Sequence, residues 1–246
     1  MYKIVFIDLD GTLLNSKKEI SDFDKHILQT ISNDIKVVFA SARGSYRIMP
    51  YIKQIETDTE DNYTVGFNGG LLMNNTDTLR LVDNCINNEN LKKLLSWLFE
   101  LKLTEVHAYD FNGSERLQLH QYPNKVIYKV VVLESKDNVL AIRNAMPDDI
   151  KNNFAITSSE PERIEFVQKG MTKQQTILKL LKHLNISPQE MIAIGDGEND
   201  IDMLKMAGLA IAMGNASDQV KEVADMITDS NDNSGVGKAL EKVLKL

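Results

Sequence analysis

Short apolar runs alternate with segments of helical periodicity in the first part of the chain and again in the last part. The apolar runs are rich in β-branched residues and end at glycine or polar residues, which predicts strands buried on both faces. We expect these strands at residues 2–7, 35–40, 63–67, 191–194, 209–212 and 226–228. We expect helices at residues 21–32, 45–55, 172–184, 200–206 and 217–223, with a last helix running to the C-terminus. Such alternation is typical of a doubly wound, mostly parallel α/β sheet.

The middle of the chain has a different pattern, in which predicted strands follow one another with few helices between them. We expect strands there at residues 71–73, 78–82, 105–109, 126–133, 153–157 and 163–167, and helices at 90–103 and 139–146. This mixture indicates a separate α+β unit with an antiparallel sheet. We therefore predict an α/β core of residues 1–79 and 168–246, interrupted by an inserted α+β domain of residues 80–167.

Composition narrows the class of protein. An apolar fraction of 43% is ordinary for a chain with a real core, and a net charge of −7 argues against a nucleic-acid binder. No apolar run is long enough to span a bilayer, so no membrane partner is expected. Cys85 is the single cysteine, which excludes an internal disulfide and fits a reducing compartment. With no signal peptide recognisable before the first strand, we expect a cytoplasmic protein.

Two acidic loops follow predicted strands at opposite ends of the chain. Asp8 and Asp10 follow the first strand, and Asp196 and Asp200 follow the strand at 191–194. Ligands bind at the carboxyl ends of the strands in open parallel sheets, so these side chains are expected to converge if the strands are neighbours. Carboxylates about 4 Å apart repel by roughly 4 kcal/mol at an effective dielectric near 20. One such loop reads most simply as a helix cap, but two at strand ends indicate a cation, and oxygen ligands favour Mg²⁺.

Other polar residues at the same sheet edge are suited to binding an anion. Gly11 permits a tight turn, and Thr12 offers a hydroxyl and a backbone amide. Ser41 and Arg43 follow the second strand at the start of a predicted helix. Lys173 also starts a helix, where a cation opposes the helix dipole by about 0.3–1 kcal/mol. Taken singly, Ser41 fits a helix cap and Lys173 a surface lysine, whereas together they could cradle a phosphoryl group.

In this chain order the motifs resemble those of the haloacid dehalogenase-like (HAD) phosphatase superfamily, in particular its Cof-type branch. The residues that carry the resemblance are Asp-Leu-Asp-Gly-Thr at 8–12, Ser41 with Arg43, Asn68-Gly69, Lys173, and Gly-Asp-Gly-Glu-Asn-Asp at 195–200. The resemblance covers the whole chain. It implies a Rossmann-like core, with the inserted domain as a cap that sets substrate specificity.

The resemblance implies a role for each matching residue. Asp8 would be the nucleophile that forms an aspartyl-phosphate, and Asp10 the general acid and base. Ser41 and Lys173 would bind the transferring phosphoryl group. Mg²⁺ would be held by Asp8, the backbone carbonyl of Asp10 and Asp196, with Asp200 supporting from behind. Substrate contacts are expected from Thr12, Arg43, Asn68, Gly69 and Asn199.

The implied activity is a Mg²⁺-dependent phosphomonoesterase acting on a small soluble phosphate ester, in a monomer or homodimer. A sugar phosphate is the first expectation, and a nucleotide or cofactor-precursor phosphate the next. The chain departs from the family pattern at Ala42, Gly70 and Gln174, where the family commonly has glycine, alanine and glycine, and no chemical group is lost. Because specificity is set in the cap, the substrate of a relative does not transfer directly.

The same residues could also serve other functions. A phosphomutase would return the phosphoryl group to a sugar instead of to water. A receiver-like phospho-acceptor places its acceptor aspartate after a middle strand, whereas the middle strands here end in Ser41 and Asn68. The intact acidic set disfavours an idle binding protein. A dinucleotide enzyme is disfavoured because no Gly-x-Gly-x-x-Gly turn follows the first strand.

Overall fold

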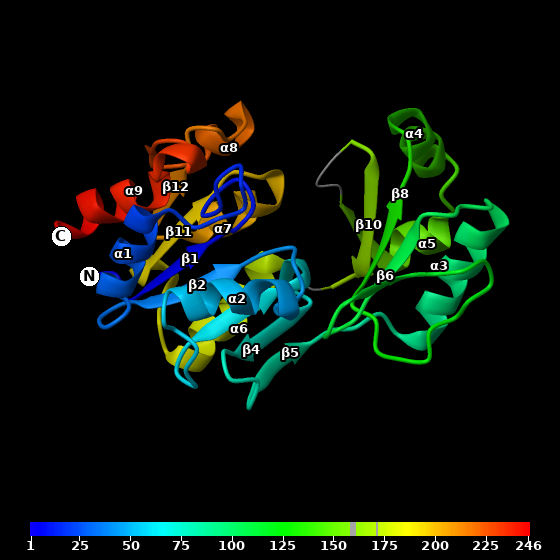
Figure 1. The fold of residues 1–246 in the computed structure, drawn as a ribbon, viewed down its shortest axis with the longest axis horizontal. Coiled ribbons are helices and arrows are strands. Elements are labelled where there is room, and N and C mark those ends of the chain that lie inside the picture. Colours follow the sequence, from blue (N-terminus) through cyan, green and yellow to red (C-terminus); the bar gives the residue numbers. More distant parts are fainter. Residues whose placement is uncertain (158–160, 171) are drawn as a thin grey trace. The chain divides into compact units, whose positions relative to one another are not determined.

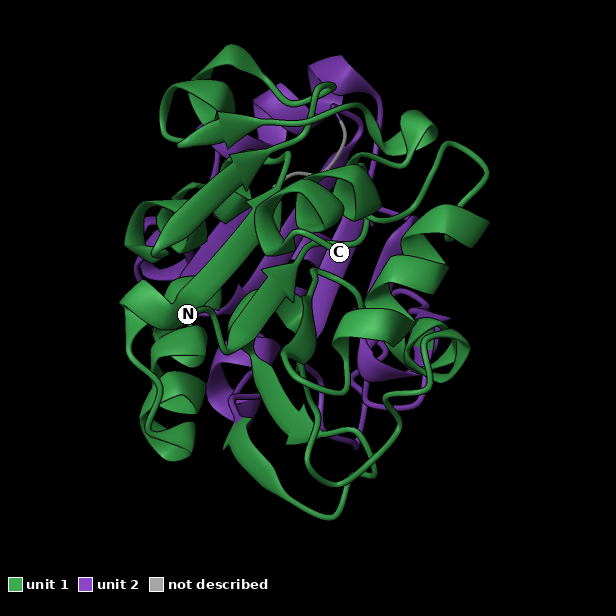
Figure 2. Ribbon diagram, turned by 90° about the vertical axis from the view of Figure 1, so that its left-hand side faces the viewer, with its two compact units in different colours: residues 1–43, 47–82, 172–246 green, residues 44–46, 83–171 purple. Residues whose placement is uncertain are grey.

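The computed structural model describes residues 1–157, 161–170 and 172–246. The chain folds into two compact units, coloured separately in Figure 2. Unit 1 comprises residues 1–43, 47–82 and 172–246, and unit 2 comprises residues 44–46 and 83–171.

Unit 1 is built on an eight-stranded sheet with the strand order β13-β12-β11-β1-β2-β3-β4-β5 (Figure 1). Pairing is parallel from β13 to β3, and β4 runs antiparallel to β3. The strands are β1 Ile4–Ile7, β2 Lys36–Ala40, β3 Tyr63–Gly66, β4 Leu71–Asn74, β5 Arg80–Asp83, β11 Met191–Gly195, β12 Leu209–Ala212 and β13 Met226–Ile227. The predicted fold class, an α/β core with a mostly parallel sheet, is confirmed.

The strand order reverses direction at β1, which lies between β11 and β2. All residues of β1 and β11 are buried, as expected for apolar strands in the middle of a doubly wound sheet. Ile4 pairs with Met191 and Ile7 with Ile194, so β1 and β11 end side by side. Ligands of open α/β sheets bind outside the carboxyl ends of the strands at such a switch point.

Two of the helices of unit 1, α1 Asp22–Ile31 and α6 Lys173–Leu184, begin at residues whose side chains cap them. The others are α2 Ser45–Gln54, α7 Ile201–Met206, α8 Asp218–Glu222 and α9 Gly235–Leu244. The Ser21 side chain accepts a hydrogen bond from the Asp24 backbone and caps α1. Thr172 caps α6 through a reciprocal capping box with Gln175, which fixes where that helix begins.

Unit 2 contains a five-stranded antiparallel sheet with the order β7-β6-β8-β10-β9. Its strands are β6 Val106–Tyr109, β7 Ser114–Arg116, β8 Lys129–Leu133, β9 Phe154–Thr157 and β10 Arg163–Gln168. Its helices are α3 Asn88–Glu100, α4 Lys136–Asn144 and α5 Asp148–Asn153. The core of the unit joins the leucines of α3 to alternate residues of the sheet, including Val130, Val132 and Phe166.

Two elements of unit 2 differ from the sequence prediction. The strand β7 is short and polar, so it carries no alternation of apolar residues to mark it. The helix α5 is a short helix that begins directly after Pro147. Both are formed by tertiary pairing and packing, which local periodicity does not report.

Candidate active site

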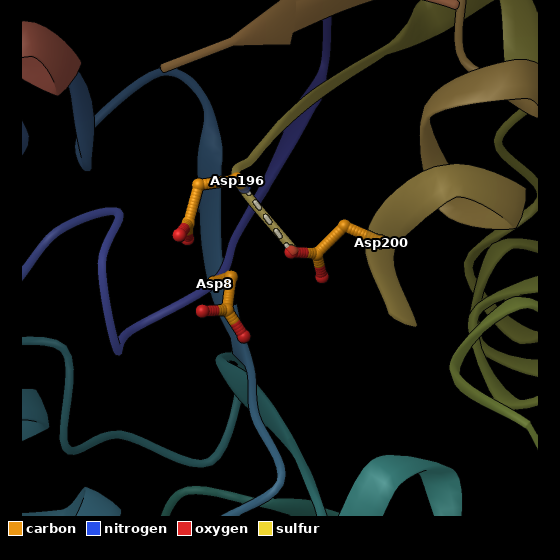
Figure 3. A group of neighbouring side chains, drawn as sticks. All are labelled: Asp8, Asp196 and Asp200. Atoms are coloured by element: carbon orange, nitrogen blue, oxygen red, sulfur yellow. Dashed lines mark hydrogen bonds between the residues drawn. The ribbon is translucent and has the colours of Figure 1, made fainter. Parts of the chain in front are cut away.

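Three aspartates from the two acidic loops lie together where β1 and β11 end (Figure 3). Asp8 extends the pairing of β1, since its backbone N–H donates to the carbonyl of Ile194 over 3.1 Å. Asp196 follows β11 directly, and Asp200 closes the 3-10 turn Glu198–Asp200. One carboxylate oxygen from each of Asp8, Asp196 and Asp200 lies within 4.8 Å of the others. The structure thus brings together three of the four acidic residues that were expected to converge, and the Asp10 carboxylate is not among them.

The turn after β1 packs tightly against Asp196. Gly11 has a φ of +84°, and a Cβ at this position would lie 2.3 Å from Asp196 Oδ2. Thr12 Oγ1 donates to Asp196 Oδ1 over 2.6 Å. Glycine is therefore required at residue 11 for both its conformation and the close approach. The Thr12 side chain, expected from the sequence to contact an anion, is buried and orients Asp196.

Lys173 connects the acidic residues from the start of α6. Its Nζ donates to Asp8 Oδ1 over 2.6 Å and to Asp200 Oδ1 over 2.7 Å. The second oxygen of Asp200 accepts from the backbone N–H of Asp196 and of Gly197, at 3.3 and 3.1 Å. Lys173 is only 3% exposed. The two carboxylates therefore offset both its burial and its unfavourable place at the positive end of a helix.

The electrostatics of this group show a surplus of negative charge. Burial, together with Asp200 and Asp196, raises the pKa of Asp8 well above its usual value, and Lys173 opposes that rise. Burial and the Asp200 charge raise the pKa of Asp196 to about 6, against the Thr12 hydrogen bond. Burial lowers the pKa of Lys173, but Asp200 and Asp8 outweigh it, so the ammonium stays charged. Lys173 pairs with two of the three carboxylates, so the group fits an additional divalent ion, and its oxygens suit Mg²⁺.

Gly69 determines how closely the turn after β3 approaches α6. Its φ is +103°, and a Cβ there would lie 2.4 Å from the carbonyl oxygen of Thr172. Thr176 Oγ1 donates to the Gly69 carbonyl over 2.7 Å. The structure therefore gives Gly69 a packing role beside the start of α6, where Lys173 lies. This role is in addition to the substrate contact that the resemblance implies.

Asn68 lies in the 3-10 turn Phe67–Gly69 and connects the second strand to the last acidic loop. Its backbone N–H donates to the Ser41 carbonyl over 3.0 Å, and its φ of +56° is one that asparagine tolerates. Its side-chain oxygen accepts from Asn199 Nδ2 over 3.2 Å. Ser41 is buried, and its Oγ accepts from the Arg43 backbone N–H. Asn68 and Asn199 thus lie together, as the expected substrate contacts would require.

Asp10 has different partners from the other aspartates. Its Oδ2 lies 2.6 Å from Arg43 Nε, and its Oδ1 lies 2.7 Å from Arg43 Nη2 and 2.9 Å from Lys18 Nζ. Partial burial raises the pKa of Asp10, but hydrogen bonds and charge from Arg43 and Lys18 lower it well below its usual value. The Asp10 carboxylate is not part of the group formed by the other three aspartates, so only its backbone carbonyl is left as an expected metal ligand.

Tyr51, which sequence reasoning did not identify, and Lys18 both contact the ion pair of Asp10. The Tyr51 hydroxyl donates to the Lys18 carbonyl over 3.0 Å and accepts from Arg43 Nη1 over 3.2 Å. Tyr51 lies on α2, far from Lys18 in the sequence. No linear motif joins these residues, so only the tertiary structure shows the contact.

Comparison with known proteins places this chain in a family. The family model described as haloacid dehalogenase-like hydrolase matches residues 5–115 and 102–240. Phosphatase YwpJ of Bacillus subtilis is 26% identical over 98% of this chain and 100% of its own length. A second B. subtilis protein, 5-amino-6-(5-phospho-D-ribitylamino)uracil phosphatase YcsE, is 30% identical over 97% of this chain and 94% of its own length.

A solved structure gives the same result at the level of the fold. The crystal structure of a haloacid dehalogenase-like hydrolase from Bacteroides thetaiotaomicron matches with a TM-score of 0.90 at 29% identity, over 99% of this chain and 100% of that chain. The protein belongs to the haloacid dehalogenase-like hydrolase family. The predictions of this family and of an enzyme of the phosphatase class are confirmed. Within the part of the chain that the structure describes, no helix has the length and apolarity needed to span a membrane.

Proposed function

We propose that the protein is a Mg²⁺-dependent phosphomonoesterase that hydrolyses a small phosphate ester through an aspartyl-phosphate on Asp8. The observation that carries this proposal is the surroundings of Asp8, which is buried at the switch point of the sheet. There it lies 2.6 Å from the Lys173 ammonium and beside Asp196 and Asp200. A carboxylate nucleophile splits one difficult displacement into two easier steps.

The proposed chemistry uses Asp8 and Asp10 in turn. The Asp8 carboxylate attacks phosphorus, forming a P–O bond to Asp8 while the P–O bond to the leaving oxygen breaks. Asp10, which takes up a proton when the charged substrate binds beside it, donates that proton to the leaving oxygen, so the product leaves as an alcohol. Asp10 then takes a proton from water as the water oxygen attacks phosphorus. The bond to Asp8 breaks, inorganic phosphate leaves, and both side chains return to their starting forms.

The phosphoryl group is proposed to be bound by the charges of Lys173 and the metal and by the hydroxyl of Ser41. Lys173 already lies against Asp8, where an incoming phosphoryl oxygen would meet its ammonium. Asp8, the Asp10 carbonyl and Asp196 would hold Mg²⁺, and Asp200 would keep Lys173 and the Asp196 loop in place. When bound, the ion would neutralise phosphoryl charge and reduce repulsion between the substrate and the nucleophile.

The substrate class is proposed to be a phosphorylated sugar or polyol, with a cofactor-precursor phosphate as the second choice. The relative of 30% identity is named for a phosphorylated ribityl compound, which belongs to the second group and carries a polyol chain like the first. We further propose that the inserted domain, residues 80–167, selects the leaving group as a cap. Contacts to the non-reacting part of a substrate can then assist the chemistry.

The test is phosphate release from a panel of sugar, polyol, nucleotide and cofactor-precursor monophosphates, with Mg²⁺ and with EDTA. Asp8→Asn is assayed beside the unaltered protein, and Asp22→Asn, at an exposed position on α1, is the matched control. We expect metal-dependent release that is lost in Asp8→Asn and retained in Asp22→Asn. Substantial release by a folded Asp8→Asn protein would refute the aspartyl-phosphate mechanism. Isomerised sugar phosphate with little free phosphate would indicate a mutase.

A further inference from the structure

Tyr51 is placed where it holds both cations of Asp10. Its hydroxyl accepts from Arg43 Nη1 over 3.2 Å and donates to the Lys18 carbonyl over 3.0 Å. The Arg43 guanidinium also lies 5.4 Å from the centre of the Tyr51 ring, within the range of a cation–π contact. One side chain of α2 therefore contacts the arginine after β2 and the hairpin after β1.

The Asp10 side chain is not fixed by packing. It is 42% exposed, whereas the Arg43 side chain that holds it is 9% exposed. Arg43 approaches both oxygens of the carboxylate, which is the directional, bidentate form of an arginine–carboxylate pair. The orientation of the Asp10 carboxylate therefore follows the position of Arg43, and Arg43 in turn lies against Tyr51.

Lys18 depends on Tyr51 through its backbone. Lys18 has a φ of +63°, a left-handed conformation that is unfavourable for a residue other than glycine. The hydrogen bond from Tyr51 to its carbonyl helps to hold this conformation, and the Lys18 ammonium then reaches Asp10. The Lys18 side chain is 59% exposed, so its pair with Asp10 is weak unless the hairpin is held in place.

We propose that Tyr51 is a positioning residue for Asp10, and this inference rests on the proposed acid and base role of Asp10. Tyr51 acts through Arg43 and the Lys18 hairpin, which together set the position from which the Asp10 carboxyl group reaches the leaving oxygen. Proton transfer requires a carboxyl group within hydrogen-bond reach of that oxygen. Without the contacts from Arg43 and Lys18, the Asp10 carboxyl group would spend less time in that position.

The test compares two phosphate esters that differ in their need for a proton. An alkyl ester from the panel has a poor leaving group, an alkoxide oxygen that must be protonated. The leaving group of 2,4-dinitrophenyl phosphate departs as the phenolate without a proton. The value of kcat/KM reports the first chemical step for each ester. Tyr51→Phe keeps the ring under Arg43 and removes both hydrogen bonds. Tyr63→Phe is the matched control. Tyr63 lies at the start of β3, the opposite end of that strand from the site, and its hydroxyl contacts His183.

We expect Tyr51→Phe to lower kcat/KM for the alkyl ester by roughly 5–20-fold, a part of the 10²–10⁴-fold that general acid–base catalysis supplies. For 2,4-dinitrophenyl phosphate we expect less than about a twofold change in the same variant, since no proton is needed. Tyr63→Phe should leave the ratio of the two values unchanged. In an Asp10→Asn background, adding Tyr51→Phe should cause no further loss with the aryl ester.

The outcomes separate this inference from the proposed function. Equal losses for the two esters, no loss, or a gain with the alkyl ester would each overturn the positioning role of Tyr51. Loss of folding in Tyr51→Phe, seen as a collapsed thermal transition while Tyr63→Phe stays folded, would make Tyr51 structural and also overturn it. If the unaltered protein releases phosphate from no ester, the proposed function fails and this inference fails with it.

Discussion

Lys173 carries its charge inside the protein, where its two carboxylate partners are buried as well. Asp8 and Asp200 both accept from its Nζ, and all three side chains are almost fully buried. Removing one partner from a buried ion pair leaves an uncompensated charge, which costs far more than removing a surface pair. The charges that are proposed to prepare Asp8 for phosphoryl transfer are therefore also charges whose removal would destabilise the fold.

Replacing Lys173 should show this difference directly. Lys173→Gln is expected to lower the free energy of unfolding by about 3–5 kcal/mol in metal-free buffer and to abolish turnover. Lys238→Gln breaks an exposed pair with Asp229 of the same length, 2.6 Å, and is expected to cost at most about 1 kcal/mol. Urea unfolding of both variants measures the two values. Equal small losses would mean that the buried charges of Asp8 and Asp200 are compensated in another way.

At the scale of elements, close approaches of the backbone fix the parts of the site. The turn after β3 meets the start of α6 at Gly69, and the turn after β1 meets Asp196 at Gly11. Neither approach leaves room for a side chain. The position of Lys173 therefore depends on a residue that carries no functional group.

Gly69→Ala should displace Lys173, and its effect should exceed that of the backbone strain of an alanine at positive φ. Its Cβ would lie 2.4 Å from the Thr172 carbonyl, so the start of α6 must shift. Gly170→Ala is a matched control with nearly the same φ, +104°, and with no atom of the described residues within 4 Å of the added Cβ. We expect Gly69→Ala to cost about 1–3 kcal/mol more than Gly170→Ala and to lower kcat, as measured by unfolding and phosphate release. Equal effects of the two variants would remove the packing role of Gly69.

A second contact between elements carries a pH dependence away from the acidic site. Asp24 on α1 is buried and accepts from the backbone N–H of Gly237 on α9 over 2.6 Å, and from the Ser21 hydroxyl over 2.8 Å. Burial raises the pKa of Asp24 above its usual value of 3.8, although these hydrogen bonds and Lys238 oppose the rise. The folded state therefore binds a proton at Asp24 more tightly than the unfolded chain does.

The sign of this effect follows from the raised pKa. The contribution to stability is fully present below pH 3.8 and is lost as the pH rises through the pKa of the folded state. Asp24→Asn cannot ionise, so the stability of the unaltered protein minus that of Asp24→Asn should be greatest at acid pH and decrease as the pH rises. Urea unfolding of both proteins across a pH series measures this difference. A difference that increases with pH would show that the pKa of Asp24 is lowered instead.

For the whole molecule, the sequence could predict what depends on local pattern. The fully buried strands β1 and β11 are apolar runs ended by aspartate or glycine, and their alternation with helices identified the doubly wound core. The polar strand β7 and the short helix α5 lack such a pattern and were not predicted. They form because neighbouring segments of unit 2 pair and pack with them.

The same limit applies to the site. The loops after two strands indicated that Asp8, Asp10, Asp196 and Asp200 would converge, because parallel strands end at one edge of a sheet. The structure groups the carboxylates of Asp8, Asp196 and Asp200, whereas that of Asp10 pairs with Arg43. The pairing of Asp10 with Arg43 joins residues 33 positions apart, and Thr12 meets Asp196 across 184 positions. Such contacts are set by how the elements pack, so motifs alone could name these residues without naming their partners.

The most direct measurement of the central claim is detection of a phosphoryl group on Asp8 itself. The protein is mixed with its best ester and Mg²⁺, quenched in acid during turnover, reduced with borohydride and digested. An aspartyl-phosphate is reduced to homoserine, so peptide mass spectrometry should find homoserine at position 8, and only when substrate is present. Turnover with unmodified Asp8, or with the phosphoryl group on another residue, would contradict the account.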